Sequence, residues 1–202
     1  MEEEKRRDKE LHIQTSEIQH DFPESVHHHR YEPTPYALLD QLFARYSLAD
    51  SDRIVDFGSG KGRLNFYLHH RFGAKTVGVE MNPHFHGQAL ENLMAYEKKW
   101  KTAGKIQFIQ CLAQDYRIQP ADNKFYFFNP FSVQIFISVL NNILESYEQK
   151  TREIDLILFF PSDDFIDYLV HWTPFELAEE MELPASGKDF RERFLVYRLS
   201  EY

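Results

Sequence analysis

One glycine-rich segment, residues 53–63, constrains the fold of this chain more than any other. It reads RIVDFGSGKGR: a short apolar run typical of a buried strand, an acid, Asp56, and then glycine at every second position. Gly58, Gly60 and Gly62 permit a sharp turn and a close approach of the backbone to a ligand. The apolar spacing of the next residues predicts a helix directly after the turn, with its free N–H groups facing that ligand.

A second acid supports a nucleoside-binding site. Residues 75–80 (KTVGVE) form another buried apolar run that ends in Glu80, about 20 residues after the glycine turn, where a carboxylate can bind both hydroxyls of a ribose. Two other glycine-rich motifs do not match this sequence. A phosphate-binding loop needs glycine at Val55 and Ser or Thr at Gly62, and a dinucleotide turn needs glycine at Arg63. The residues therefore predict a nucleoside cofactor of another kind.

The rest of the pattern predicts an α/β fold with a mostly parallel, doubly wound sheet. Apolar runs alternate with helical spacing as far as residue 160, which is typical of parallel strands covered by helices on both faces. The last two predicted strands are joined by a loop too short for a helix, so they must be antiparallel. Beyond the two strands already described, the predicted strands are 105–110, 124–128, 154–160, 175–181 and 190–199, and the predicted helices are 37–43, 64–71, 86–100 and 132–150.

Size and composition indicate one domain in a reducing compartment. The chain has 202 residues, 43% of them hydrophobic, which suffices for one core and is short for two. The net charge of -9 weighs against a broad basic surface for nucleic acid, and the single cysteine, Cys111, allows neither an internal disulfide nor zinc-ligand spacing. No apolar run approaches the ~20 residues that cross a bilayer, and no secretory signal follows the charged start. We expect a cytoplasmic protein without membrane contact.

The glycine segment and the strands that follow it resemble the class I S-adenosylmethionine (SAM)-dependent methyltransferases. In that family the first strand ends in an acid before the glycine turn, and VDFGSGKG matches this pattern residue by residue. The resemblance covers roughly residues 31–202. It implies a Rossmann-like, seven-stranded sheet whose C-terminal strand is antiparallel. It also implies that the chain binds SAM and S-adenosylhomocysteine and transfers a methyl group.

The resemblance further implies roles for single residues. Asp56 would lie near the methionine end of the cofactor, Glu80 would hold the ribose, and Leu112 would line the adenine pocket. The family often carries an adenine-reading acid at the place of Leu112, so either Leu112 packs on the adenine beside a backbone group of Ala113, or Asp115 loops back. The implied cofactor-binding residues are Asp56, Gly58, Ser59, Gly60, Gly62, Glu80, Met81, Leu112, Ala113 and Asn129.

The end of the fourth predicted strand resembles the acceptor edge of methyltransferases that modify planar amino groups. Those enzymes often carry Asn-Pro-Pro-Tyr or Asn-Pro-Pro-Phe. Asn129 and Pro130 match this motif, whereas Phe131 stands in place of its second proline and Ser132 in place of its aromatic residue. An asparagine side chain and a backbone carbonyl can accept the hydrogens of a conjugated amino group and free its lone pair, while an aromatic face stacks on it. Asn129, Pro130 and Phe131 are therefore candidate catalytic residues. The alternative is that Asn-Pro only ends the strand.

The first 30 residues are polar and mixed in charge, and we expect a frayed helix or a disordered arm before the domain at 31–202. They include His27–His29, but no carboxylate or cysteine stands beside this run at ligand spacing, so we expect no metal site. The lead-in at residues 31–36 contains two prolines and is stiff. It either folds over the cofactor, as in related enzymes, or packs on the core.

The function predicted from residues and resemblance together is SAM-dependent methyl transfer to an amino nitrogen of a nucleic acid or a protein, ahead of a small molecule. A nucleic-acid acceptor would require Arg and Lys side chains clustered around the crevice. Two alternatives remain. One is a SAM-binding regulatory or scaffold protein without transferase activity, which the incomplete Asn-Pro motif favours. The other is a nicotinamide-dependent reductase.

Overall fold

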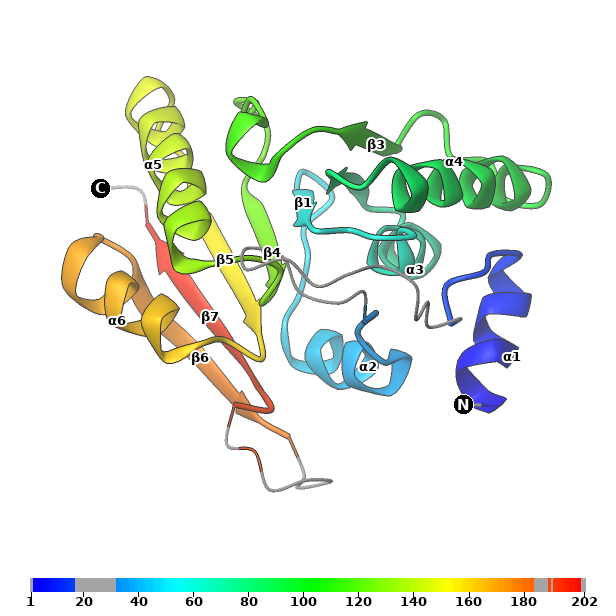
Figure 1. Cartoon of the computed structure of the whole chain (residues 1–202), viewed down its shortest axis with the longest axis horizontal. Helices are drawn as coiled ribbons and strands as arrows, with labels where there is room; N and C mark the ends of the chain where they lie inside the picture. Colours follow the sequence, from blue (N-terminus) through cyan, green and yellow to red (C-terminus); the bar gives the residue numbers. More distant parts are fainter. Residues whose placement is uncertain (1, 17–31, 184–188, 190, 201–202) are drawn as a thin grey trace.

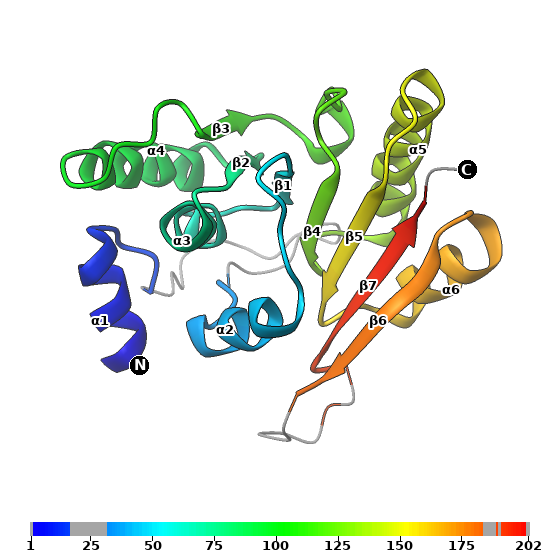
Figure 2. The same cartoon turned by 180° about the vertical axis from the view of Figure 1, so that it is seen from behind.

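A seven-stranded sheet forms the centre of the molecule (Figure 1), seen in a computed structural model that describes residues 2–16, 32–183, 189 and 191–200. The strand order is β3-β2-β1-β4-β5-β7-β6. Strands β1 to β5 are parallel, and β7 lies antiparallel between β5 and β6 (Figure 2). The predicted fold class is confirmed. The strands are β1 (Arg53–Phe57), β2 (Lys75–Glu80), β3 (Ile106–Gln110), β4 (Lys124–Phe128), β5 (Ile154–Phe159), β6 (Glu176–Glu182) and β7 (Arg193–Leu199).

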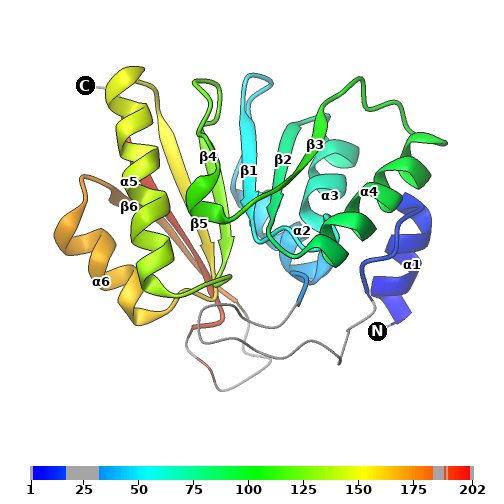
Figure 3. The same cartoon turned by 45° about the horizontal axis from the view of Figure 1, so that its top comes forward.

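Helices cover both faces of the sheet (Figure 3). Four helices contribute to the core on one face, and two helices with a short 3-10 turn cover the other. The first group is α1 (Glu2–Leu11), α2 (Tyr36–Arg45), α3 (Arg63–Phe72) and α4 (Pro83–Glu97); the second is η1 (Ala113–Asp115), α5 (Val133–Gln149) and α6 (Asp163–Trp172). None of these described helices is long and apolar enough to cross a membrane.

Strand geometry explains why the sequence predicted the sheet well. Successive side chains point to opposite faces, and both faces here are covered. On β1, Val55 and Phe57 pack into the core beneath α5, whereas Ile54 packs into the core beneath α2 and α3. A central strand of this kind must be apolar at nearly every position, so it reads as a continuous apolar run.

The observed bounds differ most from the predicted ones in α4, which begins and ends three residues earlier, and at the start of β7, which begins at Arg193 and not at residue 190. Helix α4 begins at Pro83, three residues before the predicted start, because Asn82 caps it: its Oδ1 accepts a hydrogen bond from the His84 N–H at 2.9 Å. Proline suits the first helical position, where no N–H is needed. Helix α6 begins at Asp163 with Ser162 at the cap position.

The N-terminal residues are helical over Glu2–Leu11, so the described part of the arm takes the helical one of its two predicted forms. The domain boundary at residue 31 stays a prediction. Tyr31 and His27–His29 lie outside the described residues. In the lead-in, Thr34 and Tyr36 are buried, and Thr34 Oγ1 lies 2.7 Å from the Tyr126 hydroxyl of β4. These two residues pack on the core.

The amino-terminal edge of the sheet is closed by a buried ion network. Asp155, whose side chain is fully buried, accepts hydrogen bonds from Lys124 Nζ (2.9 Å), Arg198 Nε (2.7 Å) and the Tyr46 hydroxyl (2.5 Å). Burial alone would raise the pKa of Asp155, but the hydrogen bonds from Arg198, Tyr46 and Lys124 hold it below its ordinary value. This network of paired charges links β4, β5 and β7 at the amino-terminal edge. The opposite, carboxyl edge is where the sequence-predicted site residues gather.

Candidate cofactor and acceptor site

The glycine turn connects β1 to α3 at the carboxyl edge of the sheet. Gly58, Gly60 and Gly62 all have positive φ, at +80°, +53° and +87°, a region that side-chain-bearing residues rarely adopt. A Cβ on Gly62 would lie 2.4 Å from Phe108 Cζ, and one on Gly58 would lie 2.7 Å from Pro130 Cβ. The glycines are therefore required by the backbone and by packing within the chain, in addition to any ligand.

Glu80 fixes this turn from the end of β2. One carboxylate oxygen accepts the Gly60 N–H at 2.9 Å, and the other accepts the Asn82 N–H at 2.8 Å. Burial raises the pKa of Glu80, and these two hydrogen bonds act against that rise. The Met81 backbone also contributes a hydrogen bond, and a carboxylate with about four lone-pair sites can still accept one from a hydroxyl of a ligand.

Asp56 lies on β1 beside Gly78 of β2, buried on the α3 side of the sheet. In the orientation of the Asn65 amide that satisfies both of its neighbours, Nδ2 donates to Asp56 Oδ2 at 3.2 Å and Oδ1 accepts the Gly78 N–H at 3.2 Å. Burial, and secondly the charge of Glu80, raise the pKa of Asp56 to about 8. Two acids thus share the space beneath the turn, and at neutral pH Asp56 is largely protonated.

We expect the free energy of unfolding to decrease between about pH 4 and pH 8 because of Asp56. Its pKa is about 8 in the folded protein and near its ordinary value when unfolded, so in this window the folded state binds more protons and loses stability as pH rises. Asp56→Asn should remove this part of the decrease, and the exposed Asp115→Asn should not. Urea midpoints measured from pH 4.5 to 9 test this; curves that stay parallel for wild type and Asp56→Asn would contradict it.

Two exposed apolar side chains flank the turn at the ends of neighbouring strands. Met81 follows β2 and Leu112 follows β3, and each is 39% exposed. Large apolar side chains left open at a strand edge suit the face of a planar base. Asp115 ends the η1 turn, where its N–H donates to Leu112 O at 3.0 Å and its side chain faces solvent. This geometry suits the Leu112 alternative better than the Asp115 one, and the roles of Leu112 and Ala113 stay predictions.

Asn129 stands at the end of β4 with its backbone strained. Its φ is +38°, and its side chain makes no hydrogen bond within the described part of the chain. Pro130 packs directly on Gly58, so the predicted acceptor edge touches the glycine turn. Strain of this kind in a non-glycine residue is often found at functional sites.

Phe131 has a different position from its two neighbours. It is only 4% exposed, and its ring packs edge-on against Phe127 at 6.2 Å between centroids. The structure gives Phe131 a packing role in the core beneath α5, which leaves little of the ring for contact with an acceptor. Its catalytic role stays a prediction.

No protein-family model and no curated protein matches this sequence. Solved structures do match over most of the chain. An RNA methyltransferase from Salinibacter ruber, crystallised with S-adenosyl-L-homocysteine, has a TM-score of 0.58 and 22% identity, and the match covers 83% of this chain and 92% of that one. A putative RNA methyltransferase from Pyrococcus horikoshii has a TM-score of 0.58 and 21% identity, with coverage of 97% and 98%. A putative tRNA (m1A22) methyltransferase from Streptococcus pneumoniae has a TM-score of 0.58 and 16% identity, with coverage of 81% and 69%.

The chain has the class I methyltransferase fold. Its strand order and antiparallel β7 agree with that assignment, and the fold that the sequence resemblance implied is confirmed. In open α/β sheets, ligands bind outside the carboxyl ends of the strands, where the strand order reverses. In this methyltransferase fold the reversal lies between β1 and β4, where the glycine turn meets Pro130.

The methyltransferase fold brings one more aromatic residue to this edge, which the sequence analysis missed. Phe160 follows β5, beside the end of β4, and its φ is +53°. Its ring is partly exposed, and the Arg191 guanidinium carbon lies 4.7 Å from its centroid. A sequence signal existed: the Phe-Phe pair at 159–160 runs into Pro161, much as Phe-Phe at 127–128 runs into Asn129-Pro130. Phe160 is a candidate for the aromatic face that Ser132 does not supply.

The loops that follow β1 to β5 carry few positive charges. The lysines and arginines in these five loops amount to Lys61 alone, which is 2% exposed. Asp163 and Asp164, which begin α6 after the β5 loop, are exposed. The cluster of cations that a nucleic-acid acceptor would require is therefore absent from these loops. They are residues 58–62, 81–82, 111–112, 129–132 and 160–162.

Proposed function

We propose that this protein is a SAM-dependent methyltransferase that modifies a planar amino nitrogen. The observation that carries the proposal is the contact between Gly58 of the cofactor turn and Pro130 of the acceptor edge. Asn129 directly precedes Pro130, so this contact supports a position of Asn129 near the turn whose glycines and acid suit a nucleoside cofactor. Methyl transfer needs donor and acceptor held in line and close together, and adjacency of the two half-sites is the first requirement.

The residues present fit SAM at each of its parts. Glu80 can still accept a hydrogen bond from a ribose hydroxyl, and Met81 and Leu112 offer exposed apolar surface to the adenine. The methionine end would lie over Gly58 and Gly60, with Asp56 beneath the turn. Ser59 would shape the turn rather than bind the cofactor through its N–H, because its N–H donates to the Val79 carbonyl and its buried Oγ lies against Gly78.

The task of the chain's own residues is to orient the acceptor amino group toward the cofactor. When bound, SAM supplies the activated methyl group. Asn129 Oδ1, together with a backbone carbonyl of the Asn-Pro segment, would accept the two hydrogens of the acceptor amino group and free its lone pair. Phe160 would stack on the planar group, and the rigid Pro130 would fix the distance between acceptor and turn.

Two observations bear on the class of acceptor, and they favour different classes. The three structural neighbours are named as methyltransferases of RNA or tRNA, which favours an RNA base. The scarcity of cations in the strand-end loops favours a protein amide. The first assay must therefore offer both acceptors.

Incubation of the purified protein with tritiated SAM and, separately, total RNA and total protein of a cell extract is expected to label one pool. A calorimetric titration with S-adenosylhomocysteine in parallel is expected to show binding. Binding without label in either pool would favour the SAM-binding regulatory alternative. Absence of binding, with NADH tested next, would overturn the cofactor assignment. The cytoplasmic location stays a prediction from the sequence.

A further inference from the structure

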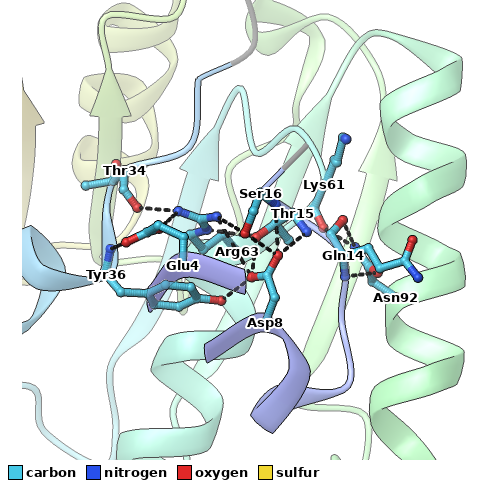
Figure 4. Close-up of polar contacts among 10 residues, drawn as sticks. All are labelled: Glu4, Asp8, Gln14, Thr15, Ser16, Thr34, Tyr36, Lys61, Arg63 and Asn92. Carbon is cyan, nitrogen blue, oxygen red and sulfur yellow. Dashed lines mark hydrogen bonds and ion pairs between the residues drawn. The ribbon is translucent and has the colours of Figure 1, made fainter. Parts of the chain in front are cut away.

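The N-terminal segment, residues 2–16, is docked against the helix that follows the glycine turn (Figure 4). Leu11 and Ile13 anchor it in the core, at 5% and 4% exposed. Polar contacts tie it to α2 through Arg7 and Asp40, and a buried group of polar contacts reaches residues 61–63 at the end of the turn. The described part of this segment therefore packs against the helices that follow it.

Asp8 organises the segment internally. Its carboxylate accepts hydrogen bonds from the N–H and hydroxyl of Thr15 (2.6 and 2.7 Å), the N–H and hydroxyl of Ser16 (2.8 and 2.7 Å) and the Tyr36 hydroxyl (2.7 Å). Asp8 is 5% exposed and Tyr36 is fully buried. Burial, and next the Asp8 charge, raise the pKa of Tyr36, so its hydroxyl stays a donor at physiological pH. Asp8 thus folds residues 15 and 16 back onto α1 and ties both to α2.

Arg63 links the segment to the glycine turn. It is the first residue of α3, directly after Gly62, and is 4% exposed. Its Nε donates to Thr15 Oγ1 at 2.7 Å and its Nη2 donates to Ser16 Oγ at 3.1 Å, while Nη1 pairs with Glu4 and also donates to the Thr34 carbonyl at 3.4 Å. Release of the segment would remove the Thr15, Ser16 and Glu4 acceptors and leave the buried guanidinium with the Thr34 carbonyl and the Tyr36 ring, which is costly.

Asn92 of α4 makes a second link. Its Oδ1 accepts the Gln14 N–H at 2.8 Å, and its Nδ2 donates to the Gln14 carbonyl at 3.3 Å and to the Lys61 carbonyl at 3.0 Å. Asn92 is 6% exposed. The backbone of the turn at Lys61 and the first helical residue after it are thus held from two directions by residues 14–16.

We propose that residues 2–16 position the glycine turn for its cofactor, with Arg63 and Asn92 as the positioning residues that transmit the docking. The inference rests on the proposed function, because the cofactor is the ligand whose affinity would depend on it. The physical reason is preorganisation: a turn already held in its binding geometry loses less conformational freedom when the ligand binds. Release of the segment should therefore weaken cofactor binding without removing any cofactor contact.

The chain offers a matched pair of variants to test this. Tyr36→Phe removes the hydroxyl that binds Asp8, and Tyr46→Phe removes the hydroxyl that binds Asp155 at the opposite edge of the sheet. Both lose one buried hydrogen bond from tyrosine to aspartate at an end of α2. Asp8→Asn is a stronger disruption of the segment. We expect the Kd for S-adenosylhomocysteine to rise several-fold in Tyr36→Phe and about tenfold in Asp8→Asn, within the usual range of coupling between sites, and to change less than twofold in Tyr46→Phe.

Hydrogen exchange of the ligand-free protein gives a second readout, independent of any cofactor. Amides of residues 58–62 are expected to exchange faster in Tyr36→Phe and Asp8→Asn than in Tyr46→Phe, compared with wild type. Equal exchange of these amides in all the proteins would overturn the inference, as would a Kd that rises equally in Tyr46→Phe. If wild type does not bind S-adenosylhomocysteine, the proposed function fails, and the exchange experiment alone decides whether the segment positions the turn.

Discussion

Asn129→Gly is expected to lower kcat for methyl transfer by about 100- to 1000-fold, the usual loss when one transition-state hydrogen-bonding group is removed. The side chain of Asn129 makes no hydrogen bond within the described residues, so its removal breaks no hydrogen bond among them. Glycine adopts the observed φ of +38° without strain, and the melting temperature should change by only a few degrees. The Kd for S-adenosylhomocysteine should stay within a few-fold.

The two substitutions Asn129→Gly and Asn129→Ala separate chemistry from backbone strain. Alanine at positive φ adds strain and should lower the melting temperature more than glycine does, while both variants should lose activity alike. kcat and KM are measured with whichever acceptor pool the wild type labels. An Asn129→Gly enzyme with wild-type kcat would mean that Asn-Pro only ends β4, as the alternative interpretation of the sequence holds.

Glu80→Ala is expected to raise the Kd for S-adenosylhomocysteine by about 5- to 150-fold, which corresponds to a loss of about 1–3 kcal/mol. The substitution removes the predicted ribose acceptor and also leaves the N–H groups of Gly60 and Asn82 without their partner. The turn should therefore loosen as well as lose a contact. Calorimetric titration of the purified variant measures the change directly.

Two further variants test whether the weaker binding of S-adenosylhomocysteine comes from the Glu80 carboxylate itself. Glu97→Ala removes a glutamate that binds the Thr102 hydroxyl at the far end of α4, and it should leave the Kd unchanged. Glu80→Gln keeps the side-chain volume but turns an NH₂ group toward donors, so it should bind more weakly than wild type. A wild-type Kd in both Glu80 variants would remove Glu80 from the cofactor site.

Local patterns were enough to predict most of the sheet. Strands buried on both faces must be apolar at nearly every position, as the run at 154–160 shows. The stretch of sequence between the last two predicted strands is too short for a crossover helix, and that strand pair is antiparallel. The glycine turn was predicted because positive φ favours glycine, and Gly58, Gly60 and Gly62 all adopt it.

The candidate site was predicted in part. Met81 and Leu112 are exposed at strand ends and Glu80 reaches the turn, positions that suit their proposed roles, and the roles themselves stay predictions. The packing of Phe131 into the core was not foreseen, because the side of the strand end on which a ring lies depends on the backbone twist after Asn129. Phe160 was missed because its pattern is that of any apolar strand until β5 is placed beside β4.

The sequence by itself determined the strands, the crossover helices and the glycine turn, since each depends on the spacing of neighbouring residues. Only the tertiary structure decided how residues 2–16 fold and pack. Their run of charges, EEEKRRDKEL, has no apolar stripe, so local spacing predicts a frayed helix or a disordered arm. In the fold, Asp8 and Arg63 become buried together. A buried charged group needs hydrogen-bonding or charged partners, from whichever part of the chain lies beside it. Those partners come from distant parts of the chain, and no local pattern encodes which ones will meet.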